Sequence, residues 1–255
     1  GGLIMEKYDL IVIGMGPAGM AVTAMAANMG LDILAIEKHK VGGECLNYGC
    51  VPSKALLKAG EVNEVTENFK EFGIKFSGKT EIDNPLEIVR EKVNEISGNK
   101  TMKAFERAKL IVDQGEAKFV DKKVVEVDGK QYTADKIFIA TGTEPLIPPI
   151  PGLKDVPRLT NLNIFAQTNI PEKLTIIGGG AIGSEMAQAF SRLGSEVNMF
   201  QIDDHLVPIG DEEAGRVLED KFKKEGIGVY NSTAINKVEE KDGKIIIHTD
   251  AGVFE

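Results

Sequence analysis

The chain has 255 residues, 42% of them hydrophobic, which is enough for one large domain or two ordinary ones. Its net charge is −9 and no basic cluster stands out, which argues against binding to nucleic acid through phosphates. No apolar run approaches the roughly 18 residues that a membrane span requires, and no signal peptide is evident. Two cysteines do not make a disulfide framework, so we expect a cytoplasmic protein.

The chain begins with a pattern typical of a dinucleotide site. Residues 8–13 are an apolar run expected of a strand buried on both faces of a parallel sheet. The loop GMGPAG, residues 14–19, opens a helical stretch that should end at Gly30, and a strand over residues 32–36 runs into Glu37. In this pattern the glycines allow a tight turn, the helix N-terminus faces the pyrophosphate, and the acid binds ribose hydroxyls. The flanking elements make it far more specific than a glycine loop alone.

Residues 42–54, GGECLNYGCVPSK, contain the only two cysteines, Cys45 and Cys50. A disulfide needs Cα atoms roughly 4.4–6.8 Å apart, whereas residues i and i+5 of a regular helix rise about 7.5 Å and lie on different faces. A bridge would therefore need a distorted turn, which Gly49 permits. Pro52 suits the first turn of a helix that starts nearby.

A disulfide between these cysteines would stabilise the fold little, because closing a loop of about five residues contributes only about 2 kcal/mol to the free energy of unfolding. It would be a plausible redox couple instead. Two thiols without a bond between them, or half of a metal site, are the alternatives that the residues leave open. Zinc needs more ligands at compact spacing, and the three histidines (His39, His205 and His248) are scattered, so we predict no metal site.

Two helices are predicted next, over residues 53–72 and from Pro85 onward, the second capped by Asn84. The apolar stripe of the second helix is predicted to comprise Ile88, Val89, Val93 and Ile96.

Short strands are predicted between residues 110 and 140, with a hairpin turn at Asp128-Gly129 and a buried strand over 136–140. The proline-rich passage after Gly142 is the predicted domain boundary. It divides the chain into residues 1–150 and 151–255.

The strand, glycine loop and helix then recur. Residues 174–177 are a predicted strand, GGGAIG follows at 178–183, and a helix should continue to Leu193. The next strand, 197–200, ends on Gln201 where an acid would stand. After it we expect a helix over residues 211–225 with Val217, Leu218 and Phe222 inward, a strand at 227–230 and a β-hairpin around 238–247. The predicted fold is therefore α/β, with two Rossmann-like dinucleotide-binding domains.

Two dinucleotide sites that bracket a cysteine pair imply a chemistry. One site can hold a flavin and the other a nicotinamide, so that electrons pass between a hydride donor, the flavin and a disulfide. Residues 42–54 resemble the redox-active signature of the FAD-dependent pyridine nucleotide–disulfide oxidoreductases. The resemblance extends through residues 140–142 to residues 178–185. Within the family, residues 52–57 are most similar to dihydrolipoamide dehydrogenase, and mercuric reductases are the nearest rival.

The resemblance implies roles for individual residues. Cys50 would be the flavin-proximal thiol, giving a thiolate–flavin charge-transfer state, and Cys45 the thiol that attacks a substrate disulfide. Lys54 would lie near the flavin and pair with Glu185, where a cation stabilises negative charge on the reduced ring. Without the resemblance, this pair would be interpreted as a solvated lysine and a helix-surface acid. The implied cofactor-binding residues are Gly14, Gly16, Pro17, Ala18, Gly19, Glu37, Lys38, Gly43, Glu44, Lys54, Glu116, Ala117, Ala140, Thr141, Gly142, Gly178, Gly180, Ala181, Ile182, Gly183 and Gln201.

Several positions depart from the family pattern. Glu44 and Tyr48 replace residues that are usually Thr and a small aliphatic. Ala181 stands where many relatives have a Tyr that covers the flavin. Gln201 replaces the acid that usually selects NAD, yet residues 201–210 contain no Arg or Lys, and Asp203 and Asp204 would repel a phosphate. We expect NADH to be preferred, with NADPH as a possible donor.

The predicted function is an FAD-dependent oxidoreductase that passes electrons between NAD(H), FAD and a Cys45–Cys50 disulfide to a dithiol or disulfide substrate such as a lipoyl group. Alternatives are a mercuric or other disulfide reductase and a nucleotide-binding redox sensor without turnover. Relatives continue with a Gly-Asp motif and an interface domain that supplies a His–Glu base across a homodimer. Nothing after Gly183 matches either element, so we expect this chain to be the N-terminal half of a longer, homodimeric protein and to be inactive by itself.

Overall fold

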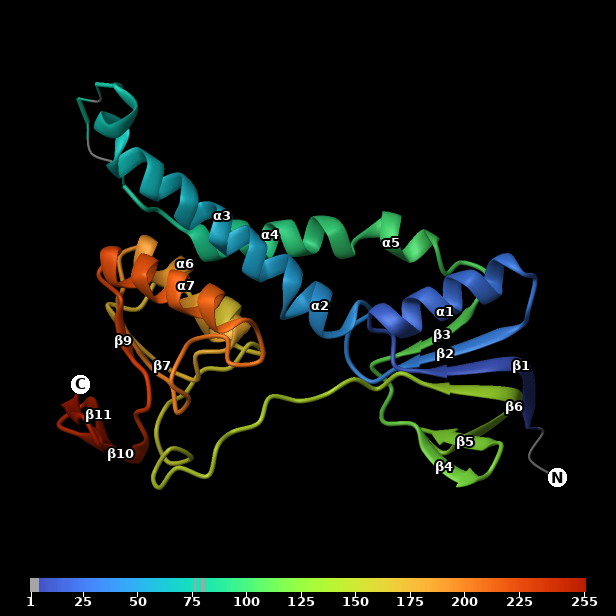
Figure 1. Cartoon of the computed structure of the whole chain (residues 1–255). Coiled ribbons are helices and arrows are strands. Elements are labelled where there is room, and N and C mark those ends of the chain that lie inside the picture. The colour runs from blue at the N-terminus through green and yellow to red at the C-terminus, as the bar shows by residue number, and fades with distance from the viewer. Residues whose placement is uncertain (1–4, 76, 79–80) are drawn as a thin grey trace. The chain divides into compact units, whose positions relative to one another are not determined.

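The computed structural model of the chain describes residues 5–75, 77–78 and 81–255 (Figure 1). These residues form two compact units: residues up to 52 together with 90–144, and residues 53–89 together with 145–255. The two units divide between residues 144 and 145, inside the proline-rich passage and before the predicted boundary of 150/151, and residues 53–89 group with the second unit rather than the first. The assignment of FAD to residues 1–150 and of NAD(P) to 151–255 stays a prediction.

The first unit is built on a six-stranded sheet with the order β3-β2-β1-β6-β5-β4. Its first four strands in that order are parallel, and β5 and β4 are antiparallel. The bounds are β1 Glu6–Ile13, β2 Ile33–Glu37, β3 Lys109–Val112, β4 Lys118–Asp121, β5 Val124–Val127 and β6 Lys130–Ile139.

Strand β1 is buried on both faces, as its continuous apolar run predicts. Leu10 and Val12 pack in the cluster that includes Ala26 and Ala27 of helix α1 (Pro17–Asn28). Ile11 and Ile13 belong to a second cluster on the opposite face, because side chains of a strand alternate between faces. Helix α1 lies along the strands in Figure 1.

The strand predicted over 136–140 is present up to Ile139, but its predicted burial is wrong, because none of these five residues is buried. Phe138 and Ile139 of β6 are 48% and 66% exposed. The reason lies in the pairing: β5 pairs only with residues 130–133 of β6. Beyond them, β1 is the partner of β6 in the sheet, and one edge of the strand is left open.

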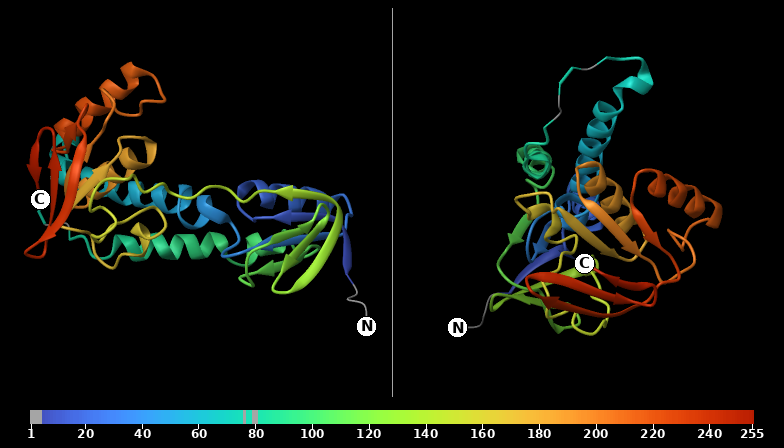
Figure 2. Two further views of the ribbon diagram at one scale, coloured as in Figure 1. Left: turned by 90° about the horizontal axis from the view of Figure 1, so that it is seen from below. Right: turned by 90° about the vertical axis from the view of Figure 1, so that its left-hand side faces the viewer.

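The second unit contains a parallel sheet of β7 (Lys173–Ile177), β8 (Glu196–Phe200) and β9 (Gly228–Tyr230). Helices α6 (Ala181–Arg192) and α7 (Glu212–Lys224) connect these strands. The predicted hairpin is the start of a three-stranded antiparallel sheet, separate from the parallel one (Figure 2), that comprises β10 (Ile235–Lys241), β11 (Lys244–Thr249) and β12 (Gly252–Phe254). The ring of Phe254 in β12 lies edge-on to the stacked rings of Phe200 and Tyr230.

The remaining helical segments are α2 Gly43–Asn47, α3 Cys50–Glu67, η1 Phe69–Phe72, α4 Pro85–Ser97, α5 Asn99–Lys103 and η2 Ile164–Ala166. Asn84 caps α4 as predicted, since its Oδ1 accepts from the backbone N–H of Glu87 at 3.2 Å. No helix in the described part of the chain is both long and apolar enough to cross a membrane.

The predicted inward faces of two helices are correct in part: Val89 and Phe222 are buried and Leu218 packs against the same core, but other predicted members are exposed. In α4 the buried residues are Leu86 and Val89, three positions apart, whereas Ile88 and Ile96 are about half exposed. In α7 Val217 is 66% exposed, and the buried face is formed by Gly215, Glu219 and Phe222. A buried Glu on that face hides the true periodicity from a count of apolar residues.

One buried ion pair joins α6 to the end of α7. The guanidinium of Arg192 donates to both carboxylate oxygens of Glu225, at 3.1 and 2.6 Å, and the side chains are 15% and 6% exposed. Burial would raise the pKa of Glu225, but hydrogen bonds from Arg192, Lys221 and Gln188 outweigh it and hold the pKa below its ordinary value.

We expect Glu225→Gln to lower the free energy of unfolding at pH 7 by about 1–3 kcal/mol, because it leaves the Arg192 charge without its carboxylate. A carboxyl with a lowered folded pKa stabilises above its unfolded pKa and loses this contribution as the pH falls through the folded pKa. The difference between wild type and variant should therefore be full above the ordinary carboxyl pKa of about 4.3 and shrink as the pH falls below it. Urea unfolding of both proteins from pH 7 to pH 3 measures it.

The exposed pair Lys92–Glu95 provides the control. Glu95→Gln should leave stability unchanged, because exposed pairs contribute little. Equal effects of the two substitutions would show that the Arg192–Glu225 pair does not join the helices as described.

Candidate functional site

The cysteine segment consists of two helical pieces with a break between them. Cys45 lies half-buried in α2, and Cys50 is the exposed first residue of α3. Tyr48 and Gly49 interrupt the helix, and a Cβ atom on Gly49 would lie only 3.1 Å from the carbonyl oxygen of Glu44 and 3.4 Å from the Cα of Cys45. The predicted distorted turn at Gly49 is thus present, with Pro52 in the first turn of α3.

This segment is attached to the first glycine loop by its backbone. The N–H of Gly42 donates to the carbonyl oxygen of Met15 at 2.7 Å. Gly43 has φ +56°, and a Cβ atom there would lie 2.6 Å from the Cα of Gly16. Two adjacent glycines therefore allow α2, which carries Glu44 and Cys45, to begin directly against the loop.

The first glycine loop has the conformation that a pyrophosphate site needs. Gly14 adopts φ +94°, and a Cβ atom on Gly19 would lie 1.8 Å from the Gly14 carbonyl oxygen. Helix α1 thus packs directly on the turn. It begins after Gly16 with Pro17 and Ala18 and has no side-chain cap, so first-turn N–H groups stay open to an anion.

Glu37 ends β2 and is bound by the loop. Its carboxylate accepts from the backbone N–H of Met15 at 2.8 Å and from that of His39 at 2.9 Å. The residue is 8% exposed. Two backbone donors therefore fix the carboxylate at the strand end, where a ribose would be recognised.

Other predicted residues of the first unit lie at the ends of the same sheet. A Cβ atom on Gly14 would lie 2.3 Å from the carbonyl oxygen of Ala140, and the Ala140 N–H donates to the carbonyl oxygen of Ile13 at 2.7 Å. Thr141 and Gly142 follow β6 directly, so this turn borders the glycine loop. Lys38 pairs with Glu116 at 3.3 Å, next to half-buried Ala117.

The second glycine loop repeats this arrangement residue by residue. Gly178 has φ +103°, and a Cβ atom on Gly183 would lie 2.1 Å from the Gly178 carbonyl oxygen. Around Gly180 no atom of the described chain lies within 4 Å of a Cβ position. Ala181 and Ile182 open α6, exposed and without a side-chain cap. The site has the same open helix N-terminus as the first.

Gln201 occupies the place of Glu37. Its Oε1 accepts from the backbone N–H of Gly179 at 3.1 Å, with the same separation of 22 residues as between Met15 and Glu37. Its Nε2 donates to the carboxylate of Asp203 at 2.9 Å. Sequence reasoning assigned Asp203 only a repulsive charge and missed this bond. An acid two residues beyond an amide at the strand end is the signal that could have revealed it.

Lys54 and Glu185 form an ion pair at 2.5 Å, joining α3 to α6 within the second unit. Their side chains are 61% and 32% exposed. The two side chains meet as the resemblance implied, while their role beside a flavin stays a prediction.

Comparisons with known proteins agree with this geometry. The family model described as "Pyridine nucleotide-disulphide oxidoreductase" matches residues 8–255. The chain is 35% identical over 236 residues to the mercuric reductase of Lysinibacillus sphaericus, which covers 92% of this chain and 43% of that protein. It is 37% identical over 244 residues to the dihydrolipoyl dehydrogenase of Thermus scotoductus, covering 94% and 52%.

Among solved structures, the HOCl-induced flavoprotein disulfide reductase RclA from Escherichia coli superposes with a TM-score of 0.83 at 24% identity. The match covers 97% of this chain and 54% of that one. This likeness establishes the fold. The chain spans about half the length of the relatives it matches.

Gly180 and Gly183 of the second loop should differ in the effect of substitution by alanine. Gly180→Ala meets no atom of the described chain, so we expect an unchanged melting temperature but binding of a dinucleotide at least about tenfold weaker, because the Cβ takes the space of the pyrophosphate. Gly183→Ala forces α6 away from Gly178 and should lower the melting temperature by about 4 °C or more.

Thermal unfolding without ligand and calorimetric titration with ADP-ribose separate the two effects. Unchanged ADP-ribose binding by Gly180→Ala would contradict a pyrophosphate site at this loop.

Proposed function

The chain belongs to the pyridine nucleotide-disulphide oxidoreductase family, and on this premise we propose that it carries the FAD site, the NAD(H) site and the redox-active cysteines of a disulfide oxidoreductase. The main support is that the Cys45–Cys50 segment is attached by Gly42 and Gly43 to the first glycine loop. This attachment supports a position of the two sulfurs next to the proposed dinucleotide site rather than on an independent loop.

The residues of the first unit fit an FAD. The open N-terminus of α1 and the bare Gly16 would receive the pyrophosphate, and Glu37 would receive ribose hydroxyls. Glu116 and Ala117 would approach the adenine side. When bound, FAD supplies two-electron transfer between a nicotinamide and a disulfide.

The cysteines carry the exchange with the substrate. NADH supplies two electrons and one proton, a hydride equivalent, which convert the Cys45–Cys50 disulfide to one thiol and one thiolate and leave NAD⁺. Cys50 is the thiolate of the reduced pair and Cys45 is the thiol, which loses its proton to the solvent as its sulfur attacks a substrate disulfide, forming a mixed disulfide and releasing one substrate thiolate. Cys50 then attacks Cys45, which restores the intramolecular disulfide and releases the second thiolate. Both leaving thiolates take up protons from water, and reversal of these steps oxidises a dithiol.

Lys54 has a separate task. It lies four residues after Cys50 in α3, a spacing that places two side chains on the same face of a helix. The carboxylate of Glu185 holds its ammonium group at 2.5 Å. We assign Lys54 as the cation that stabilises negative charge at the redox centre, with Glu185 as its positioning residue.

For the substrate we propose a dithiol or disulfide of the lipoyl kind, because residues 52–57 are most similar to dihydrolipoamide dehydrogenases and relatives of that name are 31–37% identical. Mercuric ion is the second candidate, supported by mercuric reductases at 32–36% identity. A cytoplasmic location and a homodimer are further parts of this proposal.

The roles of the two sulfurs are tested with serine variants of the FAD-loaded, full-length protein of which this chain is expected to be a part. Under anaerobic titration with NADH we expect wild type to develop a long-wavelength thiolate–flavin band. Cys50→Ser should abolish the band, whereas Cys45→Ser should keep it, because only Cys50 is assigned next to the flavin. Each substitution should lower disulfide reductase activity by about 10³-fold or more, as loss of a nucleophile does. A band that survives Cys50→Ser and disappears with Cys45→Ser would reverse the assignment.

The substrate is decided by comparing kcat/KM for lipoamide with that for mercuric ion in the same preparation of the full-length protein. We expect lipoamide to be favoured by at least about tenfold, equivalent to about 1.4 kcal/mol of transition-state binding. A preference for mercuric ion would move the protein to the second candidate.

A further inference from the structure

The side chains at the ends of β2 and β8 bind the adjacent glycine loop through different chemical groups. In the first unit the carboxylate of Glu37 accepts from two backbone donors, Met15 and His39. In the second unit the amide of Gln201 accepts from Gly179 and donates to Asp203. A carboxylate offers only acceptors, whereas an amide offers one acceptor and one donor group. The second partner of Gln201 must therefore be an acceptor.

This network also fixes which way the Gln201 amide points. The N–H of Gly179 requires an acceptor, which only Oε1 can be, so Nε2 faces Asp203. Gln201 is 4% exposed, and its oxygen is engaged by the loop. The exposed polar group at this strand end is the carboxylate of Asp203, two residues on.

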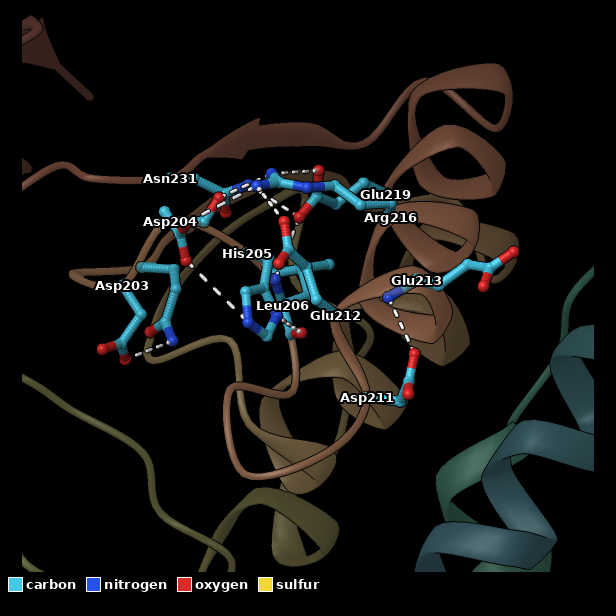
Figure 3. Close-up of polar contacts among 11 residues, drawn as sticks. Asp203, Asp204, His205, Leu206, Asp211, Glu212, Glu213, Arg216, Glu219 and Asn231 are labelled. Atoms are coloured by element: carbon cyan, nitrogen blue, oxygen red, sulfur yellow. Dashed lines mark hydrogen bonds and ion pairs between the residues drawn. The ribbon is translucent and has the colours of Figure 1, made fainter.

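Asp203 is held in place through its backbone as well. Its carbonyl oxygen accepts from the N–H of Ser232 at 2.8 Å, and the backbone N–H and carbonyl of Gln201 pair with Tyr230 and Thr233. Among the described residues, no cation forms an ion pair with Asp203. Its side chain lies at the outer edge of the cluster in Figure 3.

The rest of the loop is fixed against α7. Arg216 donates to the carbonyl oxygen of Asp204 at 2.7 Å and pairs with its carboxylate at 3.6 Å. The buried carboxylate of Glu219 accepts from the N–H of Leu206 at 3.0 Å. A Cβ atom on Gly215 would lie 2.4 Å from the Leu206 carbonyl oxygen, so helix and loop are in direct contact. Asp204 therefore has Arg216 as a cationic partner, whereas Asp203 has no cationic partner among the described residues (Figure 3).

We propose that Gln201 and Asp203 together form the ribose-selecting pair of the second nucleotide site. Gln201 holds the glycine loop, as Glu37 does in the first unit, and Asp203 is the anionic acceptor for the hydroxyls of the adenosine ribose. A 2′-phosphate would meet this carboxylate, so the pair selects NAD(H) over NADP(H). The inference rests on the proposed nicotinamide-nucleotide site and names the residues that decide its specificity.

The test uses ADP-ribose and 2′-phospho-ADP-ribose, which differ only at the ribose and do not react with flavin or cysteine. Calorimetric titration of wild type should show at least a tenfold preference for ADP-ribose. Asp203→Asn should reduce this preference about tenfold, by tighter binding of the phosphorylated probe and weaker binding of ADP-ribose. The matched control Asp204→Asn makes the same charge change one residue away and should leave the preference unchanged.

The double variant Gln201→Glu with Asp203→Asn reverses the polarity of the pair. Glu at 201 can accept from Gly179 and from the Asn amide, which returns the negative charge to the strand end, so we expect the preference for ADP-ribose to be restored. Thermal unfolding without ligand identifies any variant that misfolds, and restored preference in the double variant shows that the single change did not act through misfolding.

The outcomes separate this inference from the proposed function. If neither probe binds wild type, the second nucleotide site itself is wrong and the pair with it. If ADP-ribose binds wild type but Asp203→Asn leaves the preference unchanged, or Asp204→Asn lowers it equally, the nucleotide site stands and the pair is overturned.

Discussion

In both units the helix after the glycine loop packs in direct contact with the turn that precedes it. In each unit the last glycine of the loop brings the helix so close to the first glycine that a Cβ atom would overlap a carbonyl oxygen, at 1.8 Å for Gly19 and 2.1 Å for Gly183. This contact aims the uncapped N-terminus of the helix along the end of the sheet. An anion can then replace the missing cap, because the first N–H groups of the helix have no partner within it.

The cysteine segment depends on the same close approach. Gly42 and Gly43 both adopt positive φ, and only residues without a side chain can place α2 against Gly16. The cysteine segment is thus attached to the first glycine loop and is not an independent motif. This also explains why Cys45 and Cys50 occupy separate helical pieces: a continuous helix from Gly43 would carry the two sulfurs to different faces.

The duplicated units differ at one chemically important point. Glu37 and Gln201 hold equivalent backbone N–H groups, yet one is a charged acceptor and the other a neutral group with a donor to place. The exchange moves the negative charge from the strand end to Asp203. In the sequence, Gln201 looks like the loss of the acid that would select a nucleotide. In the structure, the negative charge lies two residues further along the chain, at Asp203.

The sequence alone was sufficient for the fold class, the family and the positions of both glycine loops, because glycine spacing and short apolar strands are local signals. It also anticipated the break at Gly49, from helix geometry, and the cap at Asn84. It failed where a neighbour decides the outcome. Phe138 and Ile139 look buried, but β5 ends before it reaches them. Val217 looks inward, but buried Glu219 shows that the packed face of α7 lies elsewhere.

The candidate site divides in the same way. The spacing in the sequence was enough to predict Cys45, Cys50 and the loop glycines as candidate site residues, because backbone freedom and thiol chemistry are properties of these residue types. The bond between Gln201 and Asp203 and the anchoring of Gly42 on Met15 are not readable, because each depends on which strand end meets which loop. The partner of a hydrogen-bonding group depends on which residues the fold brings next to it, and the sequence alone does not give these neighbours.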